Sequence, residues 1–199
     1  MGDATSPLVG LVSKEDAPPA VRAVYDQAEP VYGRLLYTWQ ALAQRPEIFT
    51  AYLPYLRSII GPGELYQRIK ELVEVRTVVL CRCLYSTSHR VRSARAAAVP
   101  DDDIVAVARG ELDGFDARER LALELAEALT VQPASVSYAD APQLVPDEML
   151  VRLRSEFSDP QIVELAATIG LWNALARFHR VMGFELDMDA PPDEVVAEL

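Results

Sequence analysis

The stretch from Cys83 to His89 reads CLYSTSH, so a thiol, a hydroxyl and an imidazole follow one another at intervals of three residues. This spacing is typical of a cysteine-pair redox site in which oxygen has replaced one sulfur. Residues three apart lie on one face of a helix, which allows a hydrogen bond between Ser86 and His89. Three interpretations are open: a lapsed redox centre, a different active site, or ordinary helix packing.

Several side chains near this stretch are candidates for the same chemistry, and each also has a structural interpretation. His89, one of only two histidines, titrates near neutral pH, yet it could equally be a surface residue. Cys83 shares the apolar side of its segment and is either core packing or a reactive thiol. Glu71 would suit acid/base work if burial raised its pKa, although an exposed helix glutamate is the default. Tyr85 could present its hydroxyl to a cleft or simply pack.

The arginines stand out in a chain with a net charge of -11. Most of them are expected to be solvated or paired with carboxylates. One that turned inward, with Arg90 as the candidate, would bind an anionic substrate group in a bidentate manner. The other histidine, His179, is expected to be an interface or surface residue on the last long helix.

Helical signals dominate the elements that must position these side chains. Pro18-Pro19 opens a first helix, Pro46 and the GPG at 61–63 separate two more, and residues 64–100 contain no internal Gly or Pro and read as one helical segment with room for a single break. Shorter helices follow near 101–110, 116–132 and 146–157. A long helix with Ser158 and Asp159 as cap candidates ends at Gly183. No alternating strand pattern is present, so an all-α fold of about seven or eight helices is predicted.

Composition excludes several classes of function. The acidic balance and the lack of a basic patch argue against a nucleic-acid partner. No apolar run reaches the roughly 20 residues that span a bilayer, and no signal peptide is recognisable at the N-terminus. Cys81 and Cys83, the only cysteines, are too close in a helix for a structural disulfide and too few for a zinc site. The sequence therefore predicts a soluble cytoplasmic protein with free thiols and no metal.

Three colinear stretches resemble the carboxymuconolactone decarboxylase and alkylhydroperoxidase D-like (AhpD-like) superfamily. They are APPAVRAVYDQAEPVYGRLLYTWQALAQRPEIFTAYL, KELVEVRTVVLCRCLYSTSHRVRSARAAAVPDDDIVAV, and DARERLALELAEALTVQPASV together with IVELAATIGLWNALARFHRVMGFELD. The resemblance implies an AhpD-like helical bundle that forms at least a homodimer. It also implies a small-molecule substrate and no cofactor.

The redox branch of that family carries a Glu, then Cys-x-x-Cys, then a His four residues beyond the second Cys. Carried over, the Glu matches Glu71, the first Cys matches Cys83, the second falls on Ser86, and Arg90 stands where the His would be. His89 is one residue early, which is about 100° of helical rotation. A serine cannot complete the disulfide, so the family's dithiol cycle is expected to be absent. Cys81 could replace it only if the helix breaks, because it lies about 200° from Cys83 around an intact one.

The sequence thus predicts one domain over 1–199, with an extended arm at 1–17, a helical core at 18–186 and a tail at 187–199. The preferred function is cofactor-free acid/base chemistry, such as decarboxylation or isomerisation, on a small organic molecule. Two alternatives remain open: a thiol peroxidase that uses Cys83, and a helical binding protein without catalysis. The predicted catalytic residues are Glu71, His89 and Cys83, and the predicted substrate-binding residues are Tyr85, Ser86 and Arg90.

Overall fold

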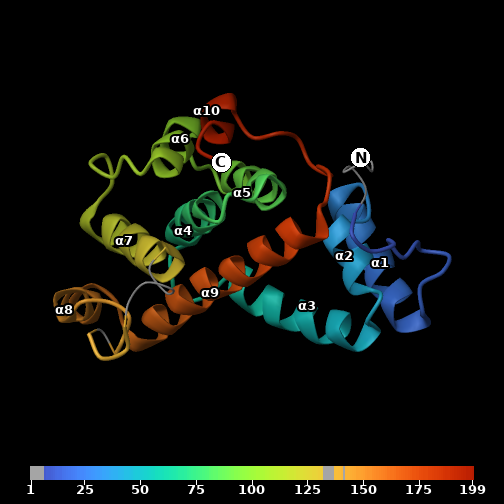
Figure 1. Ribbon diagram of the computed structural model, residues 1–199, viewed down its shortest axis with the longest axis horizontal. Helices are drawn as coiled ribbons and strands as arrows, with labels where there is room; N and C mark the ends of the chain where they lie inside the picture. The colour runs from blue at the N-terminus through green and yellow to red at the C-terminus, as the bar shows by residue number, and fades with distance from the viewer. Residues whose placement is uncertain (1–6, 132–136, 141) are drawn as a thin grey trace.

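The computed structural model describes residues 7–131, 137–140 and 142–199. All regular elements in these ranges are helices, which confirms the all-α prediction. In chain order they are α1 (Pro19–Tyr32), α2 (Tyr37–Leu42), α3 (Pro46–Ile60), α4 (Gln67–Leu80), α5 (Leu84–Ala96), α6 (Asp101–Arg109), α7 (Ala117–Val131), α8 (Asp147–Glu156), α9 (Asp159–Met182) and α10 (Asp193–Val196). Figure 1 shows α9 crossing the molecule, with α1, α2 and α3 toward one end and α4 to α7 toward the other.

The central element is α4, which packs against α5, α6, α7 and α9. Ten of its fourteen residues are buried, so it has no single apolar stripe. Even its lysine is enclosed: Lys70 pairs with Glu164 and donates hydrogen bonds to the carbonyl oxygens of Ile59 and Gly61, at 3.0 and 2.6 Å. A buried charge of this kind is tolerated because every donor finds an acceptor.

The helical segment predicted over 64–100 breaks once, between α4 and α5. Helix α4 ends at Leu80, and Arg82 adopts a left-handed conformation with φ of 52°. Such a conformation costs a non-glycine residue about 1–2 kcal/mol. A tertiary contact lies at the break, because Arg180 of α9 donates to the carbonyl oxygen of Cys81 at 3.1 Å. Cys81 and Cys83 therefore do not share a helix, and the separation of about 200° expected for an intact helix does not apply.

The N-terminal helices build their own apolar cluster, in which Tyr25, Trp39 and Phe49 stack edge to face or tilted. The irregular stretch before α1 lies against the rest of the fold. Leu8 donates its backbone N–H to the carbonyl of Met182 at 2.8 Å, and Val12 donates to Gln40 at 3.1 Å. These bonds connect the start of the described chain to α2 and to the end of α9.

Helix α9 begins and ends where the sequence predicts. A capping box between Ser158 and Gln161 opens it, and Gly183 closes it with a positive φ of 66°. The chain then turns back over α5 and ends in α10, which packs on α6 with Val195 fully buried (Figure 1). This return carries Asp187 into the interior, where only 2% of its surface is exposed.

Candidate active site

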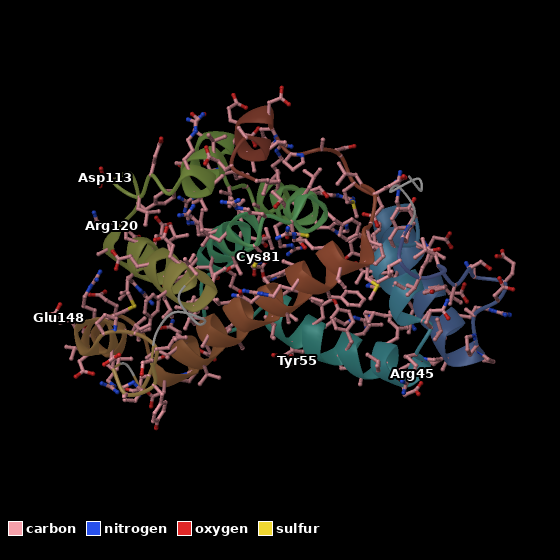
Figure 2. The ribbon with its side chains drawn as sticks, viewed as in Figure 1. Arg45, Tyr55, Cys81, Asp113, Arg120 and Glu148 are labelled. Carbon is pink, nitrogen blue, oxygen red and sulfur yellow. The ribbon has the colours of Figure 1, made fainter. Side chains whose placement is uncertain are left out.

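Cys83 stands at the first turn of α5 rather than inside a helix. Its backbone is extended, and its sulfur accepts a hydrogen bond from the backbone N–H of Ser86 at 3.4 Å. Both cysteines are free and buried. Figure 2 shows Cys81 among the side chains between α4 and α9, whereas Arg45, Asp113 and Glu148 lie at the periphery. Burial raises the pKa of the Cys81 thiol more than the nearby Arg177 and Arg180 lower it.

Ser86 makes its side-chain hydrogen bond to His179 and not to His89. The Ser86 hydroxyl lies 2.7 Å from Nδ1 of His179, and Nε2 of the same ring lies 2.9 Å from the hydroxyl of Thr38. The Ser86–His89 bond that the helical spacing allows is therefore absent. The reason is that His89 is turned toward a carboxylate from outside the helix.

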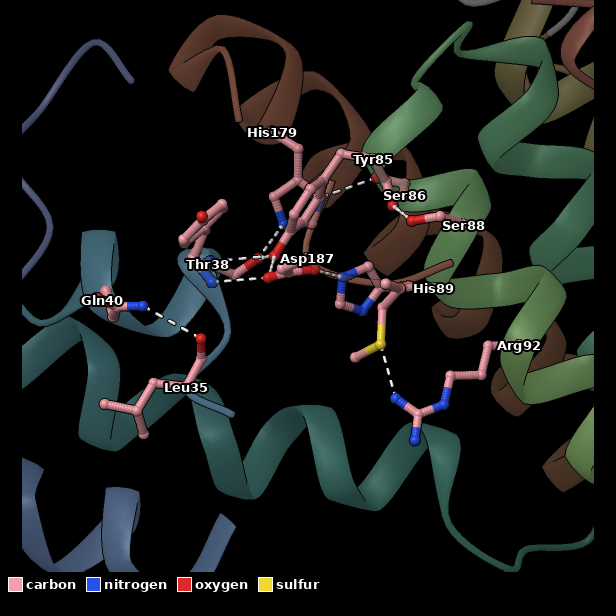
Figure 3. Close-up of polar contacts among 12 residues, drawn as sticks. Leu35, Thr38, Gln40, Tyr85, Ser86, Ser88, His89, Arg92, His179 and Asp187 are labelled. Carbon is pink, nitrogen blue, oxygen red and sulfur yellow. Dashed lines mark hydrogen bonds and ion pairs between the residues drawn. The ribbon is translucent and has the colours of Figure 1, made fainter. Parts of the chain in front are cut away.

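That carboxylate belongs to Asp187. Its Oδ1 lies 2.6 Å from Nε2 of His89, and its Oδ2 accepts from the Tyr85 hydroxyl at 2.6 Å and from the backbone N–H of Tyr37 at 2.9 Å. Figure 3 shows Asp187 between the rings of Tyr85 and His89, beside Thr38 and His179. Three parts of the chain that are distant in the sequence, around residues 37–38, 85–89 and 179–187, thus meet in one polar cluster.

The ionised carboxylate of Asp187 can only accept hydrogen bonds, and this fixes which group donates in each contact of the cluster. Tyr85 donates to Asp187, and Thr38 donates to the Tyr85 oxygen at 3.2 Å. Thr38 has no second proton, so it accepts from Nε2–H of His179, whose Nδ1 then accepts from Ser86. The result is a continuous chain from Ser86 through His179, Thr38 and Tyr85 to Asp187.

The hydrogen bond to Asp187 also fixes which ring nitrogen of His89 carries the proton. Asp187 accepts, so Nε2 of His89 carries a proton and a neutral ring leaves Nδ1 unprotonated. In the described part of the chain no hydrogen bond is made by that Nδ1. His89 is consequently oriented by a carboxylate on one side and holds a free lone pair on the other, which is the arrangement of a histidine general base.

Burial dominates the titration of both histidines. It lowers the pKa of His179 to about 3, with His89 and Arg90 adding repulsion that Asp187 only partly offsets. Burial also lowers the pKa of His89, assisted by Arg90 and Arg92 and opposed by the hydrogen bond to Asp187. Burial disfavours the Asp187 carboxylate, but its bonds from His89, Tyr85 and the Tyr37 N–H outweigh burial and lower its pKa. Both rings are therefore neutral at pH 7.

A small cavity of about 50 Å³ adjoins the cluster. His89, Arg90, Thr38 and His179 contribute its polar lining, and the rest is aromatic or aliphatic: Tyr32, Leu36, Trp39, Tyr52, Leu56, Ile60, Trp172 and Leu175. Of the six predicted site residues, His89 and Arg90 line the cavity, whereas Cys83, Tyr85, Ser86 and Glu71 lie outside its lining.

Arg90 has a carboxylate and an aromatic ring as partners, while its buried Nε has no hydrogen-bond partner in the described structure. Its guanidinium donates to the buried carboxylate of Glu74 at 2.6 Å and stacks over Trp172 at 4.2 Å from the ring centre. Burial raises the pKa of Glu74, and Arg90 opposes that rise. Arg90 therefore faces the cavity with its charge largely compensated.

Glu71 is buried, but its contacts lie away from the histidines. Its Oε1 accepts from Gln67 at 2.7 Å and from Ser93 at 3.1 Å, while Oε2 has no partner in the described structure. Ser93 lies one helical turn beyond His89 on α5. The carboxylate in contact with His89 is Asp187, which sequence reasoning did not identify.

Sequence reasoning missed Asp187, Thr38 and the role of His179. The prediction that His179 lies at the surface or an interface is wrong for this chain, since the ring is only 4% exposed. Its position four residues after Leu175, on the apolar face of α9, was a usable signal. Nothing adjacent to Asp187 or Thr38 in the sequence indicates their partners. Asp187 and His89 are 98 residues apart, and Thr38 and His179 are 141 residues apart.

The all-α fold and the site built at the start of α5 define the AhpD-like class of helical proteins. The carboxymuconolactone decarboxylase family model matches residues 46–128. The uncharacterized protein YnjA of Escherichia coli K12 is 31% identical over 136 residues, which cover 68% of this chain and 67% of YnjA. The chain belongs to the carboxymuconolactone decarboxylase family.

Two solved structures share the fold. A peroxidase-related protein from Ralstonia eutropha JMP134, described as an alkylhydroperoxidase AhpD core, superposes with a TM-score of 0.74 at 21% identity and covers 96% of this chain and 94% of its own. A cysteine-to-alanine variant of the debrominase Bmp8, in complex with 2,3,4-tribromopyrrole, superposes with a TM-score of 0.77 at 21% identity and covers 98% and 99%. At this identity the two structures establish the fold alone.

Among residues 7–131, 137–140 and 142–199, no group of three or more His, Cys, Asp or Glu side chains could hold a metal ion. None of the helices in these ranges is long and apolar enough to cross a membrane. The chemistry open to the described site residues themselves is proton transfer by His89 and thiol chemistry by Cys83.

Proposed function

We propose that the protein catalyses proton transfer on a small organic molecule, as in a decarboxylation or isomerisation, with His89 as the acid/base group. The observation that carries this proposal is the 2.6 Å bond between Asp187 and Nε2 of His89, a residue that also lines the cavity. A carboxylate behind a histidine fixes the tautomer and stabilises the imidazolium that forms when the ring takes a proton.

In a decarboxylation, CO₂ leaves and the carbanion takes a proton that water supplies through His89. An isomerisation instead moves one proton within the substrate. Neutral His89 accepts a proton from substrate carbon at Nδ1, and Asp187 stabilises the resulting cation through the Nε2 proton. The imidazolium then returns the proton to a different atom of the same molecule. Because burial lowers the pKa of His89, the ring starts each cycle in the neutral form at pH 7.

The test uses carbon-bound hydrogen exchange, because it needs no knowledge of the natural product. A panel of small ketones and lactones is incubated with the protein in D₂O, and loss of the α-proton signal is followed by NMR. Exchange catalysed by the native protein is expected to fall at least about 100-fold in His89→Gln, since general-base groups contribute about that much. Equal exchange by both proteins would refute the role of His89.

Glu71 provides a second comparison, because it matches the Glu of the family motif and was predicted from the sequence to be catalytic. Its hydrogen bonds to Gln67 and Ser93 support a structural role instead. Glu71→Gln keeps the shape of the side chain and is expected to exchange substrate protons at a rate close to that of the native protein. A loss as large as that of His89→Gln would return Glu71 to the catalytic set.

A second candidate function is thiol chemistry at Cys83. It is favoured by the position of the sulfur at the start of α5, where the Ser86 N–H donates a hydrogen bond to it. With a hydroperoxide, the thiolate would attack one oxygen, forming a sulfenic acid and releasing an alcohol. Mass spectrometry of Cys83→Ser and Cys81→Ser variants after peroxide treatment tests this: retention of the added oxygen in Cys83→Ser would refute it.

We also propose that the protein works in the cytoplasm as a homodimer or larger homo-oligomer. A shallow, mostly apolar depression lies between α7 and α9, and its lining includes Leu129, Ala166, Ile169, Gly170 and Ala174. Apolar surface of this kind favours association with a second copy. Size-exclusion chromatography with light scattering tests the assembly, and a monomer at micromolar concentration would contradict it.

A further inference from the structure

A second, polar pocket of about 310 Å³ opens beside the small cavity. Its lining consists of Tyr32, Arg34, Arg92, Asp187, Met188 and Asp189. Tyr32 lines both spaces, and Asp187 is the carboxylate that orients His89. The pocket is thus the larger space next to the proposed acid/base group, and it has room for a small organic molecule that the cavity alone does not have.

Arg92 reaches this pocket without a carboxylate partner in the described structure. Its Nη1 contacts the sulfur of Met188 at 2.7 Å, and its guanidinium lies 6.0 Å from the ring centre of Tyr32. Figure 3 shows Arg92 directed at that sulfur, on the side of Asp187 that His89 occupies. A thioether is a weak acceptor, so most of the hydrogen-bonding capacity of the guanidinium remains open.

Arg34 is the second cation of the pocket. It follows Gly33, which closes α1, and it is exposed, with no hydrogen bond or ion pair to any other described residue. The other arginines of α5 differ, since Arg90 pairs with Glu74 and Arg95 pairs with Asp101. Two uncompensated arginines that converge on one pocket are unusual in a chain with a net charge of -11.

The two carboxylates in the lining do not neutralise this pair. Asp187 already accepts hydrogen bonds from His89, Tyr85 and the Tyr37 N–H. Asp189 is exposed and makes no ion pair with Arg34 or Arg92 in the described structure. Arg34 and Arg92 therefore supply the open donors of the pocket.

We propose that Arg34 and Arg92 bind the carboxylate of a small aromatic acid whose ring rests on Tyr32 and points toward the cavity lined by His89. Guanidinium groups match carboxylates in charge and shape, and the aromatic walls formed by Trp39, Tyr52 and Trp172 suit a planar apolar body. The proposal rests on the proposed function, because it names the class of substrate for that site. Arg90, the sequence candidate for this role, pairs with Glu74 through Nη1 and does not line this pocket.

The test compares benzoate with benzamide, which has the same ring and no charge. Binding is followed by protein NMR at millimolar ligand. Arg34→Gln and Arg92→Gln are each expected to weaken benzoate binding about tenfold or more, because each removes a charge-assisted contact. Arg95→Gln is the matched control: it makes the same change on the same helix, but at an arginine paired with Asp101, and it should bind benzoate like the native protein.

Four results would overturn the proposal. The first three are the absence of benzoate binding to the native protein, equal binding of benzamide, and equal weakening by Arg95→Gln. Inorganic phosphate that competes as well as benzoate would show an anion site with no preference for the ring, and would also refute it. Bound benzoate is expected to raise the pKa of His89 in an NMR titration, since a new anion then lies near the ring.

Benzoate binding is measured independently of catalytic turnover. His89→Gln is expected to bind benzoate as well as the native protein does, because the carboxylate contacts belong to Arg34 and Arg92. Loss of proton exchange with benzoate binding intact supports both proposals. Intact benzoate binding together with unchanged exchange in His89→Gln would refute the proposed function and leave the anion pocket standing.

Discussion

Acidification is expected to destabilise the fold through His179. The pKa of the folded ring is about 3, whereas an unfolded histidine has a pKa of about 6.5. Because the folded pKa is the lower one, the unfolded state takes up a proton below about pH 6.5 that the folded state cannot accept. The free energy of unfolding then falls by about 1.4 kcal/mol per pH unit, or about 2 kcal/mol over the 1.5 units from about pH 6.5 to about pH 5.

The assay is urea denaturation at several pH values in the native protein and in His179→Gln. Glutamine can donate and accept a hydrogen bond but does not titrate. The comparison also separates His179 from other groups, because their contributions occur in both proteins and cancel in the difference. These include His89, whose lowered pKa acts in the same direction, and Glu74, whose raised pKa stabilises the fold as the pH falls.

The free energy of unfolding of His179→Gln should depend less on pH, by about 2 kcal/mol between about pH 6.5 and about pH 5. Parallel curves for the two proteins would refute the reasoning, since they would mean that His179 protonates in the folded state as easily as in the unfolded one. NMR provides a direct check. The His179 ring signals should not titrate above about pH 5.

Three further outcomes are expected. Asp187→Asn should lower the pKa of His89, because Asp187 raises it, and an NMR titration that finds no change or a rise would contradict this. The native protein should not sustain hydroperoxide turnover with a thiol reductant, because Ser86 cannot form a disulfide with Cys83. The Ser86→Cys variant tests whether the site regains this turnover. Robust activity of the native protein would contradict the prediction. Arg82→Gly should increase the free energy of unfolding by up to about 1 kcal/mol in urea denaturation, since glycine adopts the φ of 52° without strain, and a decrease would count against strain at the break.

Local signals in the sequence predicted the helical class and several helix ends. Helix α9 begins at the Ser158 cap and ends at Gly183 as predicted, because both signals act on the backbone within one turn. The break between α4 and α5 was allowed by the sequence but not located. No Gly or Pro marks it, and the turn at Arg82 coincides with a contact from Arg180 of α9.

The site depended on tertiary structure. The sequence by itself identified His89 and placed a hydroxyl where the family has its second cysteine, at Ser86. It also allowed a hydrogen bond between these two, since helical spacing describes only neighbours three or four residues apart. The fold instead brings His179 to Ser86 across 93 residues and Asp187 to His89 across 98. A buried imidazole must form hydrogen bonds with the polar groups that the fold places beside it. The spacing of residues along one helix does not predict which groups those are.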